Sequence, residues 1–323
     1  MNRVAVVGLG NISKRHRANI KKLYPESEVV AISASGKNSS QEVSNLDKYY
    51  SNLKDSVEKK IDMAIIASPA TLHAEHANFF IRLGIPVLIE KPLTSSEIDS
   101  QSIVESSEKF QIPVAINYCL RYLSSSQKIL SLLKEERIGK IYNVFAEVGQ
   151  YLPDWRSGKN YRETVSASDT LGGGVLLELS HEFDYLQWLF GELSPYSAIL
   201  RSSDELSLKV EDVADVVLLG SKGEVISVHL DFLQKKAYRK CRMVGSLGAI
   251  EWNLIQNQIT LITAKGEELI FDESNLDRNE MYLNVLLDFE RKIQGKKQEC
   301  VTLKEAMNTV ILIQKIKSIA LKK

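Results

Sequence analysis

The sequence predicts a two-domain α/β protein, with a doubly wound parallel sheet in its first half and an α+β second half. The first observation is the apolar run Val4–Val7, which passes directly into the glycine turn Gly8-Leu-Gly10. The second is the alternation of short apolar runs with helical periodicity as far as residue 117, which is typical of a parallel sheet. Beyond that point, alternating strands joined by short turns favour antiparallel pairing. With 323 residues, we expect domains at 1–118 and 119–323.

The strands predicted for the first half are short and apolar, as expected for strands buried on both faces. They are Val4–Val7, Glu28–Ser33, Ile61–Ala67, Val87–Glu90 and Val114–Asn117. Helical periodicity follows from Ile12 and over Leu72–Leu83, where Gly84 ends the helix. The segment Thr94–Glu97 matches a capping box that opens another helix. In such a sheet, ligands bind beyond the carboxyl ends of the strands.

The second half begins with an amphipathic helix predicted over Ser126–Glu136 and ends with a helix that the capping box Thr302–Glu305 opens. Between them, alternation of apolar and polar residues predicts strands. These are Ile141–Gln150, Val213–Leu219, Val225–Phe232, Lys240–Gly245, Ala249–Trp252 and Gln258–Thr263. We expect a mostly antiparallel open sheet with helices on one face. Because an open sheet face commonly needs cover, we also expect a homodimer or homotetramer.

The composition is that of a soluble globular protein, with 44% hydrophobic and 25% charged residues. The 41 basic and 41 acidic residues leave a formal net charge of +0, which argues against nucleic acid or an anionic membrane as a partner. The three cysteines, Cys119, Cys241 and Cys300, include no CxxC pair and are expected to be reduced thiols. The immediate first strand leaves no room for a signal peptide, and no apolar run reaches the roughly 20 residues of a membrane span. We therefore expect a cytoplasmic protein.

The glycine turn predicts a site for a dinucleotide. In Gly8-x-Gly10-x-x-Ser13, the first glycine permits the tight turn and the second lets the backbone approach a pyrophosphate. Ser13 replaces the third glycine but is still small. A helix that starts at Asn11 and Ile12 would direct its first amides at the phosphates. The alternative is a tight strand–helix turn that binds nothing.

The end of the second strand indicates which dinucleotide is preferred. A carboxylate there would hold the ribose 2′-hydroxyl of NAD. This chain instead has Ser33, Ser35 and Lys37, which offer hydroxyls and a positive charge. The charge favours a 2′-phosphate, so we expect NAD(P) binding with NADP slightly preferred. The alternative is a polar loop whose hydroxyls bind NAD adequately.

Four segments stand out in the first half: Gly8-Leu-Gly10, Ala67-Ser-Pro69…His73, Glu90-Lys91-Pro92 and Asn117…Arg121. Together they resemble the Gfo/Idh/MocA oxidoreductase family, which includes glucose–fructose oxidoreductase and inositol dehydrogenase. The resemblance implies that Lys91 binds or protonates the reacting oxygen beside the nicotinamide. It also implies cofactor contacts from Ser68, Pro69, His73, Glu90, Lys91 and Asn117, and a substrate contact from Arg121.

A second chemical cluster follows the glycine run Gly172-Gly-Gly174. Glu178 and His181 are three residues apart, so one helix would place them on one face, where the carboxylate could orient the histidine as a proton shuttle. The family has an aspartate four residues before this histidine, so His181 matches it more directly than Glu178 does. Asp184 is expected either to bind substrate or to buttress the helix, and His181 is alternatively a structural histidine. No second histidine or cysteine has ligand spacing, so no metal is expected.

The segment Tyr151–Arg162 is rich in aromatic and cationic side chains, including Trp155, Arg156 and Tyr161. Aromatic faces stack on sugar rings, and arginine forks bind carboxylates or phosphates. We therefore expect Trp155, Arg156 and Tyr161 to bind an anionic sugar or a nucleotide sugar. The alternative is a structured loop with solvated arginines.

These observations favour an NAD(P)-dependent oxidoreductase that acts on CH–OH groups of a small polyhydroxy substrate. Hydride would move between the nicotinamide and a carbon of a sugar, cyclitol or nucleotide sugar. The first domain would bind the dinucleotide, and the second would bind the substrate and form the oligomer. Lys91, His181 and Glu178 are the expected catalytic residues. One alternative is a reductase of a non-sugar carbonyl or imine. Another is a catalytically silent NAD(P)-sensing regulator, against which the presence of both Lys91 and His181 argues.

Overall fold

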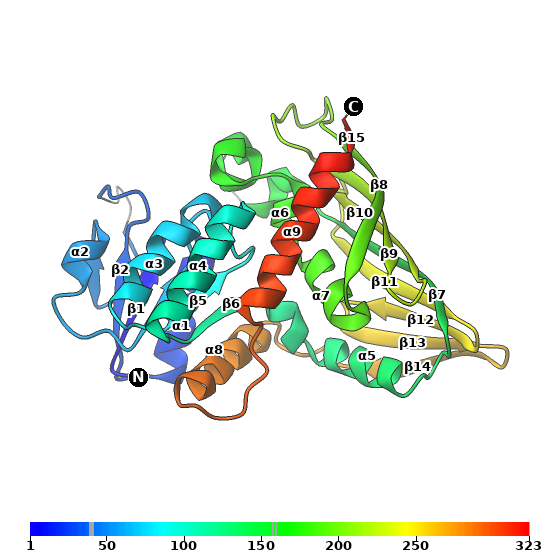
Figure 1. Cartoon of the computed structure of the whole chain (residues 1–323), viewed down its shortest axis with the longest axis horizontal. Coiled ribbons are helices and arrows are strands. Elements are labelled where there is room, and N and C mark those ends of the chain that lie inside the picture. Colours follow the sequence, from blue (N-terminus) through cyan, green and yellow to red (C-terminus); the bar gives the residue numbers. More distant parts are fainter. Residues whose placement is uncertain (39–41, 157, 159, 323) are drawn as a thin grey trace. The chain divides into compact units, whose positions relative to one another are not determined.

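The computed structural model describes residues 1–38, 42–156, 158 and 160–322 of the chain (Figure 1). Its contacts group the chain into two compact units. The first unit is Met1–Cys119 with Asn279–Val310, and the second is Leu120–Arg278 with Ile311–Lys323. The domain division between residues 118 and 119 remains a prediction.

The first unit is built on a six-stranded sheet in the order β3-β2-β1-β4-β5-β6, with every neighbouring pair parallel. The strands are β1 (Arg3–Val7), β2 (Glu28–Ile32), β3 (Lys48–Tyr50), β4 (Met63–Ile66), β5 (Val87–Glu90) and β6 (Val114–Asn117). This topology confirms the predicted doubly wound sheet. The strand order reverses between β1 and β4, which is where ligands bind in such sheets. The three-residue edge strand β3 was not predicted, because so short a segment shows no periodicity.

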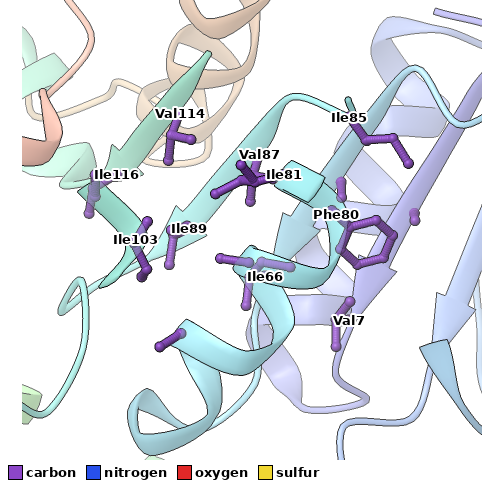
Figure 2. Packing of buried hydrophobic residues seen from close by; sticks show 14 of the residues in the cluster. Val7, Ile66, Phe80, Ile81, Ile85, Val87, Ile89, Ile103, Val114 and Ile116 are labelled. Atoms are coloured by element: carbon purple, nitrogen blue, oxygen red, sulfur yellow. The ribbon is translucent and has the colours of Figure 1, made fainter. Parts of the chain in front are cut away.

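The helices of the first unit cover this sheet and close its core. They are α1 (Asn11–Leu23), α2 (Leu53–Ser56), η1 (Ala70–Leu72), α3 (His73–Arg82), α4 (Glu97–Phe110) and α8 (Glu280–Ile293). Figure 2 shows Phe80 and Ile81 of α3 among Ile66, Ile89 and Ile103, all of them buried. Burying each such side chain contributes about 1.5–3 kcal/mol, so this cluster fixes α3 and α4 against the strands that carry the site.

Two predicted details of these helices were wrong or incomplete. The cap of α4 is Ser96, whose hydroxyl accepts from the Asp99 amide at 3.2 Å, and not Thr94. The Thr94 hydroxyl instead donates to the Ser96 carbonyl at 2.5 Å, and its oxygen lies 2.7 Å from the Ser100 hydroxyl. The prediction also missed α8, although Met281, Val285 and Phe289 recur at helical spacing and are buried.

The second unit is built on a nine-stranded sheet in the order β14-β13-β12-β11-β7-β10-β9-β8-β15. The strands are β7 (Ile141–Gly149), β8 (Leu193–Arg201), β9 (Val213–Gly220), β10 (Val225–Asp231), β11 (Tyr238–Gly245), β12 (Gly248–Asn253), β13 (Gln258–Thr263), β14 (Gly266–Asp272) and β15 (Leu321–Lys322). All pairs are antiparallel except β10–β7 and β15–β8. The predicted mostly antiparallel sheet is confirmed. Strands β8, β14 and β15 were not predicted, because Pro195 interrupts the first and the other two are largely exposed.

The helices α5 (Ser124–Lys134), α6 (Val175–Glu178) and α7 (His181–Phe190) lie on one face of this sheet (Figure 1). Helix α9 (Leu303–Ile319) begins in the first unit, and its residues from Ile311 belong to the second. It opens with the predicted capping box: the Glu305 amide donates to Thr302 Oγ1 at 3.2 Å, and Thr302 donates its amide to Glu305 at 2.9 Å. That part of the sequence prediction is confirmed.

The other face of this sheet carries a charged cluster on β8, β9 and β10. His229 Nδ1 lies 2.6 Å from Asp215, and its Nε2 lies 3.2 Å from Asp231. Arg201 also pairs with Asp215 at 2.7 Å. The hydrogen bonds with Asp231 and Asp215 raise the pKa of His229 to about 9, although burial opposes them. The imidazole is therefore charged at neutral pH in the folded chain.

This raised pKa predicts how stability depends on pH. His229 titrates at about 9 when folded and near 6.5 when unfolded. Its stabilising charge is therefore fully present below about pH 6.5 and is lost as the pH rises through about 9. We expect the wild-type melting temperature to fall over this range, and to fall less in His229→Gln. Thermal unfolding followed by circular dichroism measures the difference. Ser194→Ala, at an exposed position of β8, should keep the wild-type dependence, and an unchanged dependence in His229→Gln would contradict the assignment.

Candidate active site

The predicted cofactor residues of the first unit lie along one edge of its sheet. Gly8, Ser68, Lys91 and Asn117 stand at or just after the carboxyl ends of β1, β4, β5 and β6. Glu90 and Asn117 are paired in register. Because parallel strands end on the same side, the topology gathers these residues at one edge.

The turn between β1 and α1 requires its first glycine. Gly8 has φ +114°, and a Cβ there would lie 2.3 Å from the Ala67 carbonyl oxygen. Ser13 Oγ donates to the same carbonyl at 3.3 Å. The serine in the third glycine position is therefore a tie between α1 and the end of β4.

The beginning of α1 is suited to a phosphate. Gly10 is its N-cap and no side chain caps the helix, so the amides of Asn11 and Ile12 stand at an uncapped end. A Cβ on Gly10 would meet nothing within 4 Å among the described residues. An uncapped helix start beside open space binds anions through its amides and dipole. The residues present therefore fit the pyrophosphate of a dinucleotide.

A buried carboxylate stands immediately before Lys91. Glu90 Oε1 lies 2.6 Å from His16 Nε2 and accepts from Asn117 Nδ2 at 2.6 Å, and its Oε2 accepts from the Lys91 amide at 3.3 Å. Burial by itself raises the pKa of Glu90, but the hydrogen bonds from His16 and Asn117 and the Lys91 charge outweigh it and hold that pKa below its usual value. Glu90 is therefore ionised. The sequence prediction missed His16, although it lies one turn beyond Ser13 on the same side of α1.

His73 is buried beneath the loops that follow β4 and β5. Its Nε2 lies 2.9 Å from the Ser68 carbonyl, and its Nδ1 lies 3.0 Å from the Pro92 carbonyl. Burial lowers the pKa of His73, against the effect of these hydrogen bonds. The histidine thus holds Ser68, the neighbouring Pro69 and the segment after Lys91 in place. A contact of His73 with the cofactor remains a prediction.

A cavity of about 750 Å³ opens beyond the end of β2. Its lining includes the predicted residues Ser33 and Ser35, whose hydroxyls lie 3.3 Å apart. It also includes the cations Lys54 and Arg82, which the sequence prediction did not name. The full lining is Ser33, Ala34, Ser35, Gly36, Asn52, Leu53, Lys54, Leu72, Glu75, His76, Phe79, Arg82 and Leu83. Lys37 is exposed next to this segment, and Ser39 and Ser40 of the same loop lie outside the described residues.

In the second unit, the glycine run packs against its own chain. A Cβ on Gly173 would lie 2.5 Å from the Val165 carbonyl oxygen, and one on Gly174, at φ +96°, would lie 2.5 Å from Glu211. The Gly173 amide donates to the Ser168 carbonyl at 2.8 Å. These glycines therefore let the short turns at η5 (Val165–Ala167) and η6 (Asp169–Leu171) sit tightly against the start of α6.

The single helix predicted to carry Glu178 and His181 was wrong. Helix α6 ends at Glu178 and α7 begins at His181, with Leu179 and Ser180 between them. Leu179 leaves helical geometry at φ −103°, ψ 27°. The two side chains are therefore carried by consecutive helices. Both are partly exposed, and their catalytic roles remain predictions.

Arg121 and Asp184 form a buried bidentate ion pair. Arg121 Nε and Nη2 donate to the two oxygens of Asp184 at 3.0 and 2.7 Å, and the guanidinium lies 5.6 Å from the centre of the Trp188 ring. The side chains are only 7% and 1% exposed. This geometry favours the helix-buttressing alternative for Asp184. A second pair that the prediction missed joins buried Glu182 of α7 to Arg239 of β11 at 2.7 and 2.8 Å.

Two aromatic residues of the predicted 151–162 segment contact other parts of the second unit. Trp155 packs edge-on against Phe232 with ring centres 5.2 Å apart, and its Nε1 donates to the Gln150 carbonyl at 3.2 Å. Tyr161 donates its hydroxyl to the Leu206 carbonyl at 3.2 Å. Arg156 is partly exposed. Substrate contacts from these residues remain predictions, and Lys159 lies outside the described residues.

Among residues 1–38, 42–156, 158 and 160–322, no group of three or more histidine, cysteine, aspartate or glutamate side chains is placed to hold a metal ion. Over those same residues, no helix has the length and apolar character needed to cross a membrane.

Comparisons with known proteins place both halves of the chain. The model of an oxidoreductase family with an NAD-binding Rossmann fold, GFO_IDH_MocA, matches residues 2–118, and the model of the GFO/IDH/MocA C-terminal domain matches residues 126–251. Levoglucosan dehydrogenase in complex with NADH has a TM-score of 0.84 at 18% identity, covering 98% of this chain and 96% of that one. This likeness confirms the two-domain fold.

Two curated relatives are enzymes of sugar or cyclitol chemistry by their names. The dTDP-3,4-didehydro-2,6-dideoxy-alpha-D-glucose 3-reductase of Streptomyces violaceoruber is 28% identical over 195 residues, 59% of this chain and 54% of that protein. Inositol 2-dehydrogenase of Paracoccus denitrificans is 24% identical over 258 residues, 76% of this chain and 72% of that protein. The matched part of the chain covers 53% and 66% of the lengths of the first two curated relatives.

The buried pair of Arg121 and Asp184 predicts a large loss of stability when one partner is removed. An uncompensated buried charge costs roughly 3–5 kcal/mol, whereas an apolar pair of similar volume is often neutral. We expect Asp184→Ala to lower the free energy of unfolding by about this amount and Arg121→Met with Asp184→Leu to recover most of it. Denaturant unfolding followed by tryptophan fluorescence measures both.

The exposed pair of Arg242 and Glu251, 3.6 Å apart, is the control for this test. Glu251→Ala should cost less than about 1 kcal/mol, because exposed ion pairs contribute little. An equally small loss for Asp184→Ala would show that the buried pair is not a buttress.

Proposed function

The chain belongs to the Gfo/Idh/MocA oxidoreductase family, and from this premise we propose that it transfers a hydride between a nicotinamide dinucleotide and a carbon of a sugar, a cyclitol or a nucleotide sugar. The observation that carries the proposal is the strand-end group of the first unit. This group consists of the uncapped start of α1, the buried carboxylate of Glu90 at the end of β5, and Lys91 directly after it. The names of the relatives support the substrate classes.

The residues that would hold the dinucleotide are those of the strand-end group. The amides at Gly10, Asn11 and Ile12 would hold the pyrophosphate. Asn117 Oδ1 is buried and, within the described part of the chain, has no hydrogen-bond partner, so it is an acceptor that an amide of the cofactor would satisfy. When bound, the nicotinamide supplies the hydride chemistry.

Lys91 and His181 are the proposed groups for the proton and the charge on the reacting oxygen. An ammonium at a strand end stabilises negative charge that develops on an alkoxide, and imidazole accepts or returns a proton near neutral pH. Glu178, the last residue of α6, is the proposed partner of that histidine. Trp155, Arg156 and Tyr161 are the proposed substrate contacts, through stacking and charge.

We further propose that NADP is slightly preferred over NAD. No carboxylate follows β2, where a NAD-specific site places one. The cavity beyond β2 instead contains Ser33 and Ser35 together with Lys54 and Arg82. These cations favour a 2′-phosphate over a bare hydroxyl, although Glu75 in the same lining opposes them.

We also propose that the chain forms a homo-oligomer and is located in the cytoplasm. The sheet of the second unit exposes Phe145, Leu219 and Val225 to 47%, 41% and 37% on the face that carries His229. A homodimer or homotetramer would cover these apolar side chains. No nucleic acid or membrane partner is proposed, because the net charge is zero.

The function is tested by supplying sugars, cyclitols and nucleotide sugars with each cofactor and following nicotinamide absorbance. Lys91→Ala should lower turnover by roughly 100-fold or more, because an electrostatic or acid–base group is lost. Cofactor affinity should change little. Lys109→Ala, at an exposed position of α4, is the control and should keep wild-type turnover. Normal turnover in Lys91→Ala removes Lys91 from the mechanism. Tight cofactor binding without turnover of any substrate would instead favour a silent regulator.

The cofactor preference is tested by Ala34→Asp, which places a carboxylate in the lining of the cavity beyond β2. Like-charge repulsion should weaken NADP, and a hydrogen bond to the ribose hydroxyl should improve NAD relative to it. Fluorescence titration of both reduced cofactors measures the ratio of their dissociation constants. Ala34→Asn adds similar volume without charge and is the control. An unchanged ratio in Ala34→Asp would show that this cavity does not recognise the 2′ group.

A further inference from the structure

Three elements of the first unit meet at one carboxylate. Glu90 ends β5 and is 7% exposed, His16 lies on α1 and is 1% exposed, and Asn117 ends β6 and is 1% exposed. Both His16 Nε2 and Asn117 Nδ2 lie 2.6 Å from Glu90 Oε1. A buried carboxylate with no donors would cost several kcal/mol, so its donors are required wherever Glu90 is ionised. The carboxylate therefore fixes α1 and β6 against the end of β5.

His16 meets Glu90 through one ring nitrogen only. Its Nδ1 is buried and has no hydrogen-bond partner in the part of the chain that the structure describes. The ring lies edge-on to Tyr282 of α8, with centres 6.4 Å apart, and Arg15 covers the same tyrosine. His16 Nε2 therefore meets Glu90 while the ring packs against α8.

The same helix carries the uncapped start that fits a pyrophosphate. His16 is five residues beyond Asn11, or about 7.5 Å along the helix axis. Lys91 is the next residue after Glu90. A ligand that orders the start of α1 therefore acts on the helix that carries His16. His16 bonds Glu90, and Glu90 accepts from the Lys91 amide.

We propose that Glu90 is a positioning residue that couples dinucleotide binding at α1 to the placement of Lys91, with His16 as its partner. The coupling deepens the proposed function and rests on it. Both carboxylate oxygens already meet groups of the first unit, at His16, Asn117 and the Lys91 amide. The carboxylate acts by holding the Lys91 backbone in register with the helix that binds the phosphates.

The test measures the accessibility of the Lys91 amine to a trace acylating reagent by peptide mass spectrometry, with and without saturating NADPH. In the wild type, NADPH should slow the labelling of Lys91 several-fold. In Glu90→Gln, which keeps the side-chain shape but loses the charge, the protection should be reduced. The dissociation constant of NADPH should rise by no more than the same factor, because the coupling between the two sites is reciprocal. His16→Gln with Glu90→Gln, whose two amides can hydrogen-bond to each other, should restore part of the protection. Turnover in Glu90→Gln should fall on the order of 10- to 100-fold, because small misplacements of a reacting group have effects of that size.

Asn19→Ala is the matched control. Asn19 is a buried polar residue of α1 that bonds Asn279 of the same unit at 2.7 Å. Its loss should lower the melting temperature but leave Lys91 protection and turnover as in the wild type. If Glu90→Gln behaves like Asn19→Ala, Glu90 is merely structural and the positioning role is wrong, while the proposed function stands. If NADPH does not bind the folded wild type, the proposed function and the coupling both fail.

Discussion

The first unit depends on compensating one negative charge. A carboxylate taken out of water must find donors, and Glu90 finds them on a helix and on a neighbouring strand rather than in its own segment. His16 and Asn117 meet this requirement, each 2.6 Å from Glu90 Oε1. The carboxylate also fixes the backbone from which Lys91 projects. The same principle recurs in the second unit, where Asp184 and Glu182 of α7 are each held by one arginine.

Most of the fold could be predicted because it depends on local patterns. The parallel sheet followed from short apolar runs, and the strand β13 was predicted with its observed bounds. Segments with little local signal were missed: β3 has three residues, β14 is mostly exposed, and Pro195 breaks the pattern of β8. Helix α8 was missed although its pattern is regular, and its residues belong to the first unit despite their late place in the chain.

The candidate site could be predicted only in part. Gly8 and Lys91 could be named as candidates because turn geometry and a short motif point to them from neighbouring residues. His16 was not found, because its importance lies in a contact with a residue 74 positions away. The same holds for Arg239 and its partner Glu182, 57 positions apart. The break between Glu178 and His181 was also invisible to helical periodicity, because a two-residue interruption leaves the spacing of the flanking residues nearly intact.

The account is tested most directly by a crystal structure of the chain with NADPH. It predicts phosphate oxygens at the amides of Asn11 and Ile12, the nicotinamide at the strand end that carries Lys91, and Glu90 still bonded to His16 and Asn117. A dinucleotide bound away from the start of α1 would contradict the account. So would a Glu90 side chain that turns from His16 while the cofactor is in place.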